Sequence, residues 1–452
     1  MASHPIDYRY GSKEMRLVWD EEHRLAYYLA VEAALARALA ALGKIPPSAA
    51  REISEKANTN HVKLARVRAI EAETKHDVMA MVKALTEQCG AAGAYVHLTA
   101  TSYDIVDTAQ AMQLKEGLEI LSQKGRKLLG TLVKQAEKHA ATPMVGRTHG
   151  QHALPITLGF KLANYCEKLG SGIQNLEWDA ENLVQAKFSG AVGTYSAQSL
   201  YEMKGTQLEA AVMKELGLKA APISTQVVGR ENIGRIVADM AVVAGTLEQI
   251  AKEVRNLQRT EIGELGEPFA KSQVGSSTMA QKKNPVDSEN VCANARVVRS
   301  CVAIALENIA LEHERDLTNS ASERSLLPTA FILLDDMLER MEGVMAGLVV
   351  NEEQMKYNLG LTRGAIMAEA LITHLVKKGV GRQEAHELMR LASQKAVAQK
   401  KDLKEVLLAD ESVMKALGGQ ELDGLLEYGN YTGSAVEKTG EIINKWGKWA
   451  GK

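Results

Sequence analysis

The sequence predicts an all-α fold built around a bundle of long helices. Aromatic residues make up only 4% of the 452 residues, and the chain has only nine prolines. Strands are enriched in aromatic and β-branched residues, and proline breaks helix interiors, so both counts favour helix. No proline occurs in residues 48–142, 156–221 or 329–452, which leaves room for helices of considerable length.

Apolar periodicity indicates where these helices run. Residues 21–42 predict an amphipathic helix that ends at Gly43, just before the Pro46–Pro47 pair. Residues 104–140 predict a long helix with leucines three and four apart, and 365–400 predict two helices joined near 379–381. Residues 233–257 carry a heptad seam, which predicts a long helix packed at a shallow angle in a bundle. The apolar positions of this seam are Ile233, Ile236, Met240, Val243, Leu247, Ile250, Val254 and Leu257.

A chain of this length predicts two or three domains. We divide it into an N-terminal helical domain (1–100), a central long-helix bundle (101–351) and a C-terminal helical domain (352–452). No stretch with the composition of a flexible linker marks either boundary.

Composition excludes several classes of function. The formal net charge is −2, from 54 basic and 56 acidic residues, so neither a nucleic-acid-binding nor a membrane-binding surface is expected. The four cysteines are scattered without metal-site spacing, which fits a reducing compartment. The sequence shows no signal-peptide pattern and no apolar run of membrane-spanning length, so we expect a cytoplasmic protein.

Residues 260–285 form the segment with the clearest chemical character. A loop of this length inside a compact domain is usually functional or disordered. It contains Gly275-Ser276-Ser277-Thr278-Met279-Ala280-Gln281-Lys282-Lys283-Asn284-Pro285, which groups hydroxyls, lysines and an amide. A structural explanation is a helix start, with Asn284 as the N-cap and Pro285 at the first helical position. That explanation does not account for the glycine, the serines or the lysines upstream.

These residue types suit the removal of a proton next to a carboxylate. Negative charge then builds on the carboxylate, so such a site needs a base and donors aimed at the charge. A glycine-rich loop that enters a helix supplies backbone N–H groups and the positive end of the helix dipole. Lys282 adds a cation and Asn284 an amide donor.

Two more segments carry groups suited to such a site. Thr101-Ser102-Tyr103-Asp104 has the spacing of a capping box, and its two hydroxyls at a helix start suit a carboxylate; His97 lies just upstream. Gly146-Arg147-Thr148-His149-Gly150-Gln151-His152 follows the long helix, and a histidine there is a plausible acid near neutral pH. His149 and His152 are three apart, but no third ligand follows at a spacing typical of a metal site.

Together these three segments resemble signature elements of the fumarase/aspartase superfamily, whose members release fumarate from substituted succinates. Ala280 departs from that pattern, which usually has proline there. The resemblance implies that Ser276 is the base and His149 the general acid, with Lys282 stabilising charge. It implies substrate contacts for Thr101, Ser102, Thr148, Gln151, Ser277, Met279 and Asn284. It implies no metal and no organic cofactor.

Further elements resemble the branch of this superfamily that acts on succinylated purine nucleotides. His313-Glu314-Arg315-Asp316-Leu317-Thr318-Asn319-Ser320-Ala321-Ser322-Glu323-Arg324 carries two arginines and hydroxyls suited to a phosphate. On charge pattern alone a solvated helix-to-loop transition is the favoured interpretation. The resemblance implies nucleotide contacts for Arg9, Tyr10, Gln226, Arg315, Ser320 and Arg324. His76 would support the leaving group or the phosphate, and Asp77 and His97 would lie in the same substrate site.

The length of the predicted helix 104–140 bears on assembly. At 1.5 Å per residue an unbroken helix would be about 55 Å long, so Thr101 and His149 would lie near opposite ends. They could share a small site only if chains associate antiparallel, unless Gly117, Gly125 or Gly130 breaks the helix. We therefore expect a homo-oligomer with composite sites, and the resemblance implies a homotetramer with each site built from three chains.

The sequence leaves rival functions open. Other branches of the superfamily, such as argininosuccinate lyase, aspartase and carboxymuconate cycloisomerase, share the Ser276 and His149 elements. Residues 313–324 separate them from the nucleotide branch, because non-nucleotide substrates need no phosphate site. A non-catalytic bundle protein on this fold is a rival of another class, but such a protein could lose Ser276, His149 or Lys282, and this chain has all three.

Overall fold

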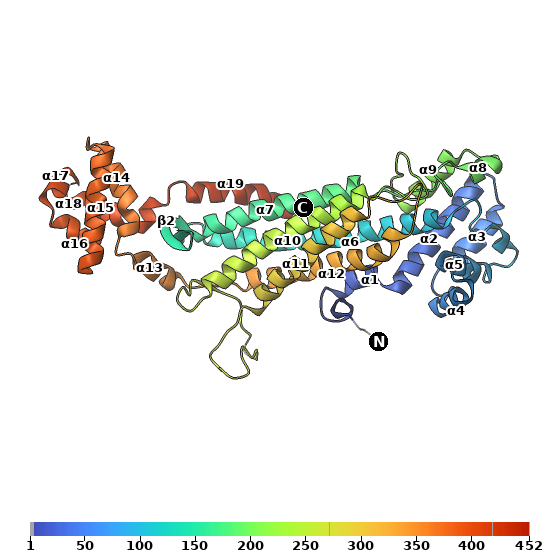
Figure 1. Ribbon diagram of the computed structural model, residues 1–452, viewed down its shortest axis with the longest axis horizontal. Coiled ribbons are helices and arrows are strands. Elements are labelled where there is room, and N and C mark those ends of the chain that lie inside the picture. Colours follow the sequence, from blue (N-terminus) through green and yellow to red (C-terminus); the bar gives the residue numbers. More distant parts are fainter. Residues whose placement is uncertain (1–3, 271, 418, 452) are drawn as a thin grey trace. The chain divides into compact units, whose positions relative to one another are not determined.

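The computed structural model describes residues 4–270, 272–417 and 419–451, and it is all-α apart from two small sheets. The chain forms two compact units. The first unit comprises residues up to 124, 172–245 and 293–339, and the second comprises 125–171, 246–292 and 340 onward. Residues of α6 (Ser102–Lys138), α7 (Leu158–Asn182), α10 (Glu231–Leu257), α11 (Val286–Glu307) and α12 (Thr318–Ala346) contribute to both units (Figure 1). The predicted division into three domains follows the sequence and remains a prediction.

The first unit also holds the helices that precede α6 and those between α7 and α10 (Figure 1). They are η1 (Pro5–Asp7), α1 (Lys13–Val18), α2 (Glu21–Ala41), α3 (Pro47–Lys56), α4 (Leu64–Thr74), α5 (Asp77–Thr86), η2 (Ala91–Tyr95), α8 (Ser196–Leu200) and α9 (Gly205–Leu216). The predicted helix over residues 21–42 is α2, and it ends before Gly43, whose φ of 68° suits glycine.

In the second unit, a β-hairpin of β1 (Pro143–Thr148) and β2 (Gln151–Thr157) follows α6, and β3 (Leu265–Gly266) pairs with β4 (Val349–Val350). The later helices are α13 (Glu352–Gly360), η3 (Ala365–Met367), α14 (Ala368–Lys377), α15 (Arg382–Gln399), α16 (Leu403–Leu408), α17 (Glu411–Leu417), α18 (Gly419–Leu426), η4 (Tyr428–Tyr431) and α19 (Ala435–Ala450). The two helices predicted near residues 365–400 are α14 and α15, joined at 378–381.

The long predicted helices are confirmed. α6 covers 37 residues, and its three glycines do not interrupt it. Gly117 is required for packing, because a Cβ there would lie 2.7 Å from the Phe331 ring of α12 in the first unit. α10 buries all eight positions of the heptad seam, from Ile233 to Leu257.

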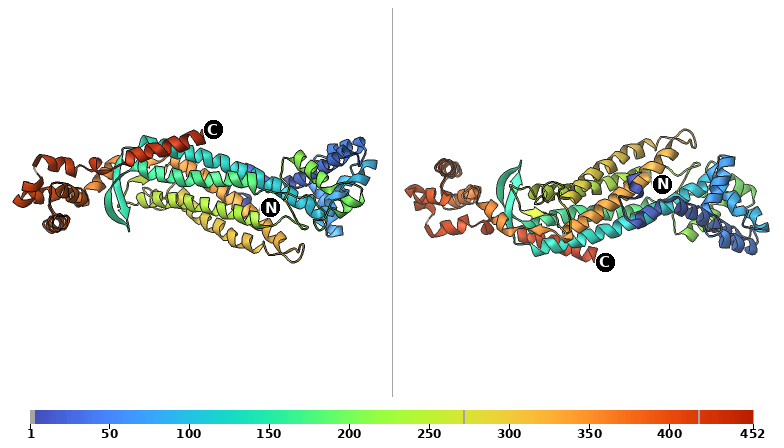
Figure 2. Two further views of the ribbon diagram at one scale, coloured as in Figure 1. Left: turned by 90° about the horizontal axis from the view of Figure 1, so that it is seen from above. Right: turned by 90° about the horizontal axis from the view of Figure 1, so that it is seen from below.

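Side-chain contacts within each unit hold the long helices side by side. In the first unit Asn294 of α11 donates to Asp336 of α12 at 3.2 Å. In the second unit Lys161 of α7 pairs with Glu253 of α10 at 2.5 Å, and Trp446 of α19 packs over Gly170 of α7. Figure 2 shows α19 running beside α7 in both views. Trp446 is fully buried, so this contact forms part of the core of the second unit.

The structure also describes the cysteines and the helices that were considered as possible membrane spans. All four cysteines are buried and free. Within the described ranges, no single helix has the length and apolar character to cross a membrane, although the bent pair formed by Glu352–Gly360 and Ala365–Lys377 meets that test by length and composition.

Candidate active site

A cavity of about 620 Å³ lies in the first unit, and we call it the first-unit cavity. Segments distant in the sequence meet there: the junction of α4 and α5, the start of α6, the loop at 226 and the start of α12. Seven of the predicted site residues line it, namely His76, Asp77, Ser102, Gln226, Arg315, Ser320 and Arg324. The structure therefore brings together most of the residues that the resemblance assigns to nucleotide contacts.

His76 reaches the first-unit cavity because of the turn that precedes α5. Lys75 ends α4 in the left-handed conformation, with a φ of 56°. His76 is the N-cap of α5, and its Nδ1 accepts a hydrogen bond from the backbone N–H of Met79 at 3.3 Å. The imidazole is exposed and remains able to act on a ligand through Nε2.

The start of α6 is anchored by the buried carboxylate of Asp104. One carboxylate oxygen accepts from the Thr101 backbone N–H at 2.9 Å, which confirms one half of the predicted capping box. The other accepts from Lys187 Nζ at 2.5 Å and from the backbone N–H of Ser189 at 3.0 Å. Because Asp104 and Lys187 are fully buried, this pair fixes the helix start that carries Ser102.

Arg315 is preorganised in the first-unit cavity. Its guanidinium carbon lies 3.7 Å from the centroid of the Tyr103 ring, and Nη1 donates to Gln226 Oε1 at 2.7 Å. Its Nε is buried without a hydrogen-bond partner among the described residues. Arg324 pairs with Asp77 at 3.1 Å. Stacking and pairing hold both guanidinium groups before any ligand arrives.

A buried ion-pair network that the sequence analysis missed supports the start of α12. Arg230 donates to both carboxylate oxygens of Asp107, at 2.8 and 2.9 Å, and its Nε donates to Glu323 at 2.9 Å. Glu323 also accepts from Asn319 and Gln110. Glu323 precedes Arg324, so the network sets the helix turn that presents Arg324. The only sequence signal was that Glu323 stands next to Arg324, a predicted nucleotide-binding residue, and Arg230 lies 93 residues away.

His97 lies outside the set of residues that line the first-unit cavity. Its ring Nδ1 lies 2.6 Å from Glu32 Oε1, and its backbone N–H donates to Glu32 Oε2 at 3.0 Å. Burial is the strongest influence on this ring and opposes its charge. The Glu32 hydrogen bond and charge, together with the charge of Asp104, outweigh burial and raise the pKa of His97 above its ordinary value. Arg9, Tyr10 and Thr101 also lie in the first unit without lining the cavity.

His149 occupies the turn of the β-hairpin in the second unit, an element that the sequence analysis did not predict. Thr148 pairs with Gln151, so the turn consists of His149 and Gly150, with φ values of 54° and 74°. Two positive φ values match the right-handed twist of a two-residue hairpin. All four of these residues are exposed.

The hairpin is tied to the start of the 260–285 loop by a buried ion pair. Arg147 of β1 donates to both oxygens of Glu264 at 2.8 and 2.7 Å, and Asn358 of α13 donates to the same carboxylate at 2.8 Å. Glu264 is fully buried. Burial and the Arg147 charge lower the pKa of the neighbouring His152 ring. Within the second unit this pair couples the segment of His149 to the segment of Ser276.

Internal hydrogen bonds shape the 260–285 loop. Ser276 Oγ accepts from the backbone N–H groups of Thr278 and Met279, at 3.3 and 3.1 Å. Gly275 is required there, since a Cβ would lie 1.9 Å from the Lys282 carbonyl oxygen. The turn therefore fixes the Ser276 hydroxyl close to the chain that carries Lys282.

The predicted cap of α11 is wrong. α11 begins at Val286, and Asn284 does not cap it, because its side-chain amide donates to the Gly275 carbonyl at 2.9 Å. Glu267 caps the helix instead: its carboxylate accepts from the backbone N–H groups of Asp287 and Ser288, at 3.2 and 2.6 Å. An acceptor from elsewhere in the loop thus replaces the local one.

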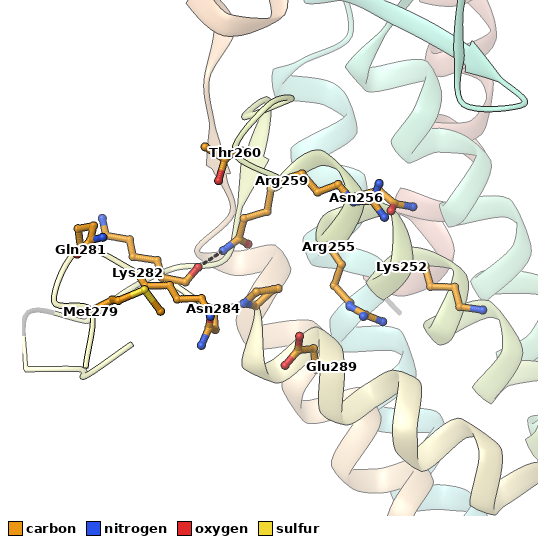
Figure 3. A pocket seen from close by; sticks show the side chains of 13 residues that line it. Lys252, Arg255, Asn256, Arg259, Thr260, Met279, Gln281, Lys282, Asn284 and Glu289 are labelled. Atoms are coloured by element: carbon orange, nitrogen blue, oxygen red, sulfur yellow. Dashed lines mark hydrogen bonds between the residues drawn. The ribbon is translucent and has the colours of Figure 1, made fainter. Parts of the chain in front are cut away.

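A second cavity, of about 900 Å³, lies between the end of α10, the loop and the start of α11; we call it the loop cavity (Figure 3). Gln258 of this region donates to the Lys283 carbonyl at 3.0 Å, the bond dashed in Figure 3. Met279, Lys282 and Asn284 line the loop cavity, whereas Ser276 and Ser277 do not. Thr148, His149 and Gln151 line neither of the two cavities.

Comparison with known proteins first defines the class. A family model described as "Lyase" matches residues 8–300. A solved fumarate lyase from Mesorhizobium sp. BNC1 superposes with a TM-score of 0.89 at 31% identity, covering 98% of this chain and 99% of that one. The 3-carboxy-cis,cis-muconate lactonizing enzyme from Pseudomonas putida gives 0.90 at 32% identity, covering 98% and 99%. The fold and the signature elements are those of a lyase of the fumarase/aspartase superfamily.

The finer comparison identifies the branch. A second family model, described as "Adenylosuccinate lyase C-terminus", matches residues 364–441. The adenylosuccinate lyase of Pyrococcus abyssi is 50% identical over 444 residues, which is 98% of both chains. This chain therefore belongs to the adenylosuccinate lyase family.

Proposed function

We propose that this chain cleaves adenylosuccinate to AMP and fumarate, and SAICAR to AICAR and fumarate, by β-elimination. The observation that carries the proposal is the first-unit cavity, where Arg315, Arg324 and Ser320 gather with Gln226. Bidentate arginine donors and a hydroxyl suit a phosphate, which the non-nucleotide substrates of other superfamily branches lack. Family membership and the match to the C-terminal model support the same choice.

In the proposed mechanism Ser276 Oγ, as its alkoxide, removes the proton from the succinyl carbon next to a carboxylate. The electron pair of that C–H bond forms the double bond of fumarate, and the C–N bond breaks. His149 gives its proton to the departing nitrogen. Lys282 and loop N–H groups stabilise the carboxylate as negative charge builds on it. The alkoxide form needs that same positive surrounding.

The remaining predicted residues hold the substrate in this proposal. Carboxylates of the succinyl group are bound by Thr101, Ser102, Thr148 and Gln151, with Ser277, Met279 and Asn284 beside them. The nucleotide is bound by Arg9, Tyr10, Gln226, Arg315, Ser320 and Arg324. His76, Asp77 and His97 complete the site near the leaving group or the phosphate. The chemistry uses side chains and backbone groups, with no metal or organic cofactor.

We further propose a homotetramer in which each site takes residues from three chains. The continuity of α6 supports this assembly, because 37 helical residues separate its two ends by about 55 Å. Thr101 and Ser102 stand at its start, and the His149 hairpin follows its end. Antiparallel packing of two such helices would bring a start from one chain near an end from another. Sedimentation equilibrium at enzymatic concentrations tests it, and a fully active monomer would contradict it.

We propose that the protein works in the cytoplasm, where a nucleotide substrate is available. Its four buried free thiols are compatible with that reducing compartment.

The test of the function is fumarate release from adenylosuccinate by the purified full chain, with SAICAR, argininosuccinate and aspartate assayed alongside. Turnover of adenylosuccinate and SAICAR without the other two is the expected result. Release from argininosuccinate or aspartate alone would keep the elimination chemistry and reject the nucleotide assignment. AMP should also inhibit far better than adenosine, because only AMP carries the phosphate.

A further inference from the structure

The loop cavity has a strongly one-sided charge. Among the described residues that line it, five are cationic and only Glu289 is acidic. The cationic residues are Lys252, Arg255, Arg259, Lys282 and Lys283. The chain as a whole has a net charge of −2, so this excess is a property of the cavity rather than of the protein surface in general.

The loop cavity contains two arginines, the half-buried Arg255 and the exposed Arg259. Neither guanidinium has a hydrogen-bond or ion-pair partner in the part of the chain that the structure describes. Some exposed arginines elsewhere do have such partners: Arg66 pairs with Glu87 at 2.5 Å, and Arg390 with Glu387 at 2.6 Å. Like charges that share a cavity without acidic partners repel, so a bound anion would relieve that repulsion.

Helix electrostatics alone do not explain this gathering. Arg255 belongs to the last turn of α10, where a cation is favoured by the helix dipole. The dipole does not account for Lys282 and Lys283, which a loop about 25 residues further along the chain brings to the same cavity. In Figure 3, Arg255 projects from α10 toward the first turn of α11, while Lys282 approaches from the loop.

The chemistry of these side chains indicates a carboxylate ligand. A guanidinium group presents a planar fork that matches a carboxylate with two parallel hydrogen bonds. The amides of Asn256 and Gln258 line the same cavity, and its volume of about 900 Å³ exceeds what a four-carbon diacid needs. Two groups of cations, from α10 and from the loop, suit a ligand with a carboxylate at each end.

We propose that the loop cavity binds a short dicarboxylate, with Arg255 and Arg259 holding one carboxylate and Lys282 holding the other. For this chain the ligand is fumarate, an identity that rests on the proposed function. Arg255 and Arg259 thereby become binding residues for the released product. The loop cavity would retain fumarate after the C–N bond has broken and would set how strongly fumarate inhibits the enzyme.

Calorimetric titration of the full-length protein with fumarate tests this site without relying on turnover. The double variant Arg255→Gln/Arg259→Gln should bind fumarate at least about tenfold more weakly than the wild type, because two charge-assisted contacts are lost. The control is Arg390→Gln, which removes an exposed arginine from a different segment and should leave the fumarate Kd unchanged. A double variant with wild-type affinity, or a wild type that binds no fumarate, would overturn the proposal.

A phosphate titration identifies the class of anion, and the turnover assay separates this inference from the proposed function. Inorganic phosphate should bind the wild type and the double variant alike; a loss for phosphate equal to that for fumarate would reject a dicarboxylate site. Fumarate binding that depends on Arg255 and Arg259, in a protein that releases no fumarate from adenylosuccinate, would keep the dicarboxylate site and reject the proposed function.

Discussion

The first-unit cavity and the loop cavity both gather cations, but within the described residues only the first has its arginines paired. Arg315 stacks on Tyr103 and donates to Gln226, and Arg324 pairs with Asp77. In the loop cavity Arg255 and Arg259 lack such partners among the described residues, and Lys283 has only the Phe269 ring, 5.5 Å from its Nζ.

This difference separates two ways of binding an anion. Paired and stacked cations are held in place before the ligand arrives, so little conformational entropy is lost on binding. Unpaired cations at the edge of a loop gain most of their order from the ligand. The comparison suggests a rigid recognition surface in the first-unit cavity and a ligand-dependent surface in the loop cavity.

The largest expected effect is a loss of kcat from a substitution in the 260–285 loop. Ser276→Ala should lower kcat by about 10³-fold, since general-base catalysis contributes about 10²- to 10⁴-fold. Substrate affinity should be nearly unchanged, because the first-unit cavity is intact. Steady-state kinetics together with equilibrium binding of adenylosuccinate to the variant measure both quantities. Near-normal turnover would show that the base is another group.

The second prediction concerns the ion pair between the hairpin and the loop. Arg147→Gln should destabilise the protein by about 3 kcal/mol, because it leaves the buried Glu264 carboxylate without its cation. The double variant Arg147→Gln/Glu264→Gln should recover much of that loss, since no buried charge remains. Denaturant unfolding measures the difference. If the double variant were no more stable than the single one, charge burial would not be the cause.

A smaller effect, on KM, is expected from replacing Arg315 in the first-unit cavity. Arg315→Lys should raise KM for adenylosuccinate about tenfold, with kcat within a few-fold of the wild type, because lysine loses both the stacking and the planar fork. Arg390→Lys, at an exposed ion pair, is the matched control. A KM that did not move would place the phosphate elsewhere.

The last prediction concerns two carboxyl groups in the first unit, Asp179 and Asp239, which interact with each other. Burial of Asp179, followed by the charge and hydrogen bond of Asp239, raises the pKa of Asp179 to about 7, although Arg235 acts in the opposite direction. Between pH 4 and 7 the folded state therefore binds more protons than the unfolded state, and stability falls as pH rises.

Asp179→Asn should remove this pH dependence. At pH 8 the variant should exceed the wild type in the free energy of unfolding, with no gain at pH 4. Denaturant midpoints at the two pH values measure it. An equal shift at both would indicate a packing effect rather than a titration.

Much of the fold followed from the sequence, because helix periodicity is local. Each apolar position in the seam of residues 233–257 lies within four residues of the next, so its spacing predicts α10 directly. The length of α6 and the end of α2 at Gly43 follow from similarly local signals. The hairpin around His149 was missed because its strands are short and its turn depends on positive φ values at His149 and Gly150.

For the site, the sequence by itself determined which chemical groups are available, in short runs such as residues 275–285 and 313–324. Only the tertiary structure decided which groups meet. It placed Arg230 against Glu323, replaced the Asn284 cap with Glu267, and gathered Arg255 with Lys282 around one cavity. The physical reason is that caps and helices arise from neighbours along the chain. Buried ion pairs and cavities depend on packing between segments that have no common local pattern.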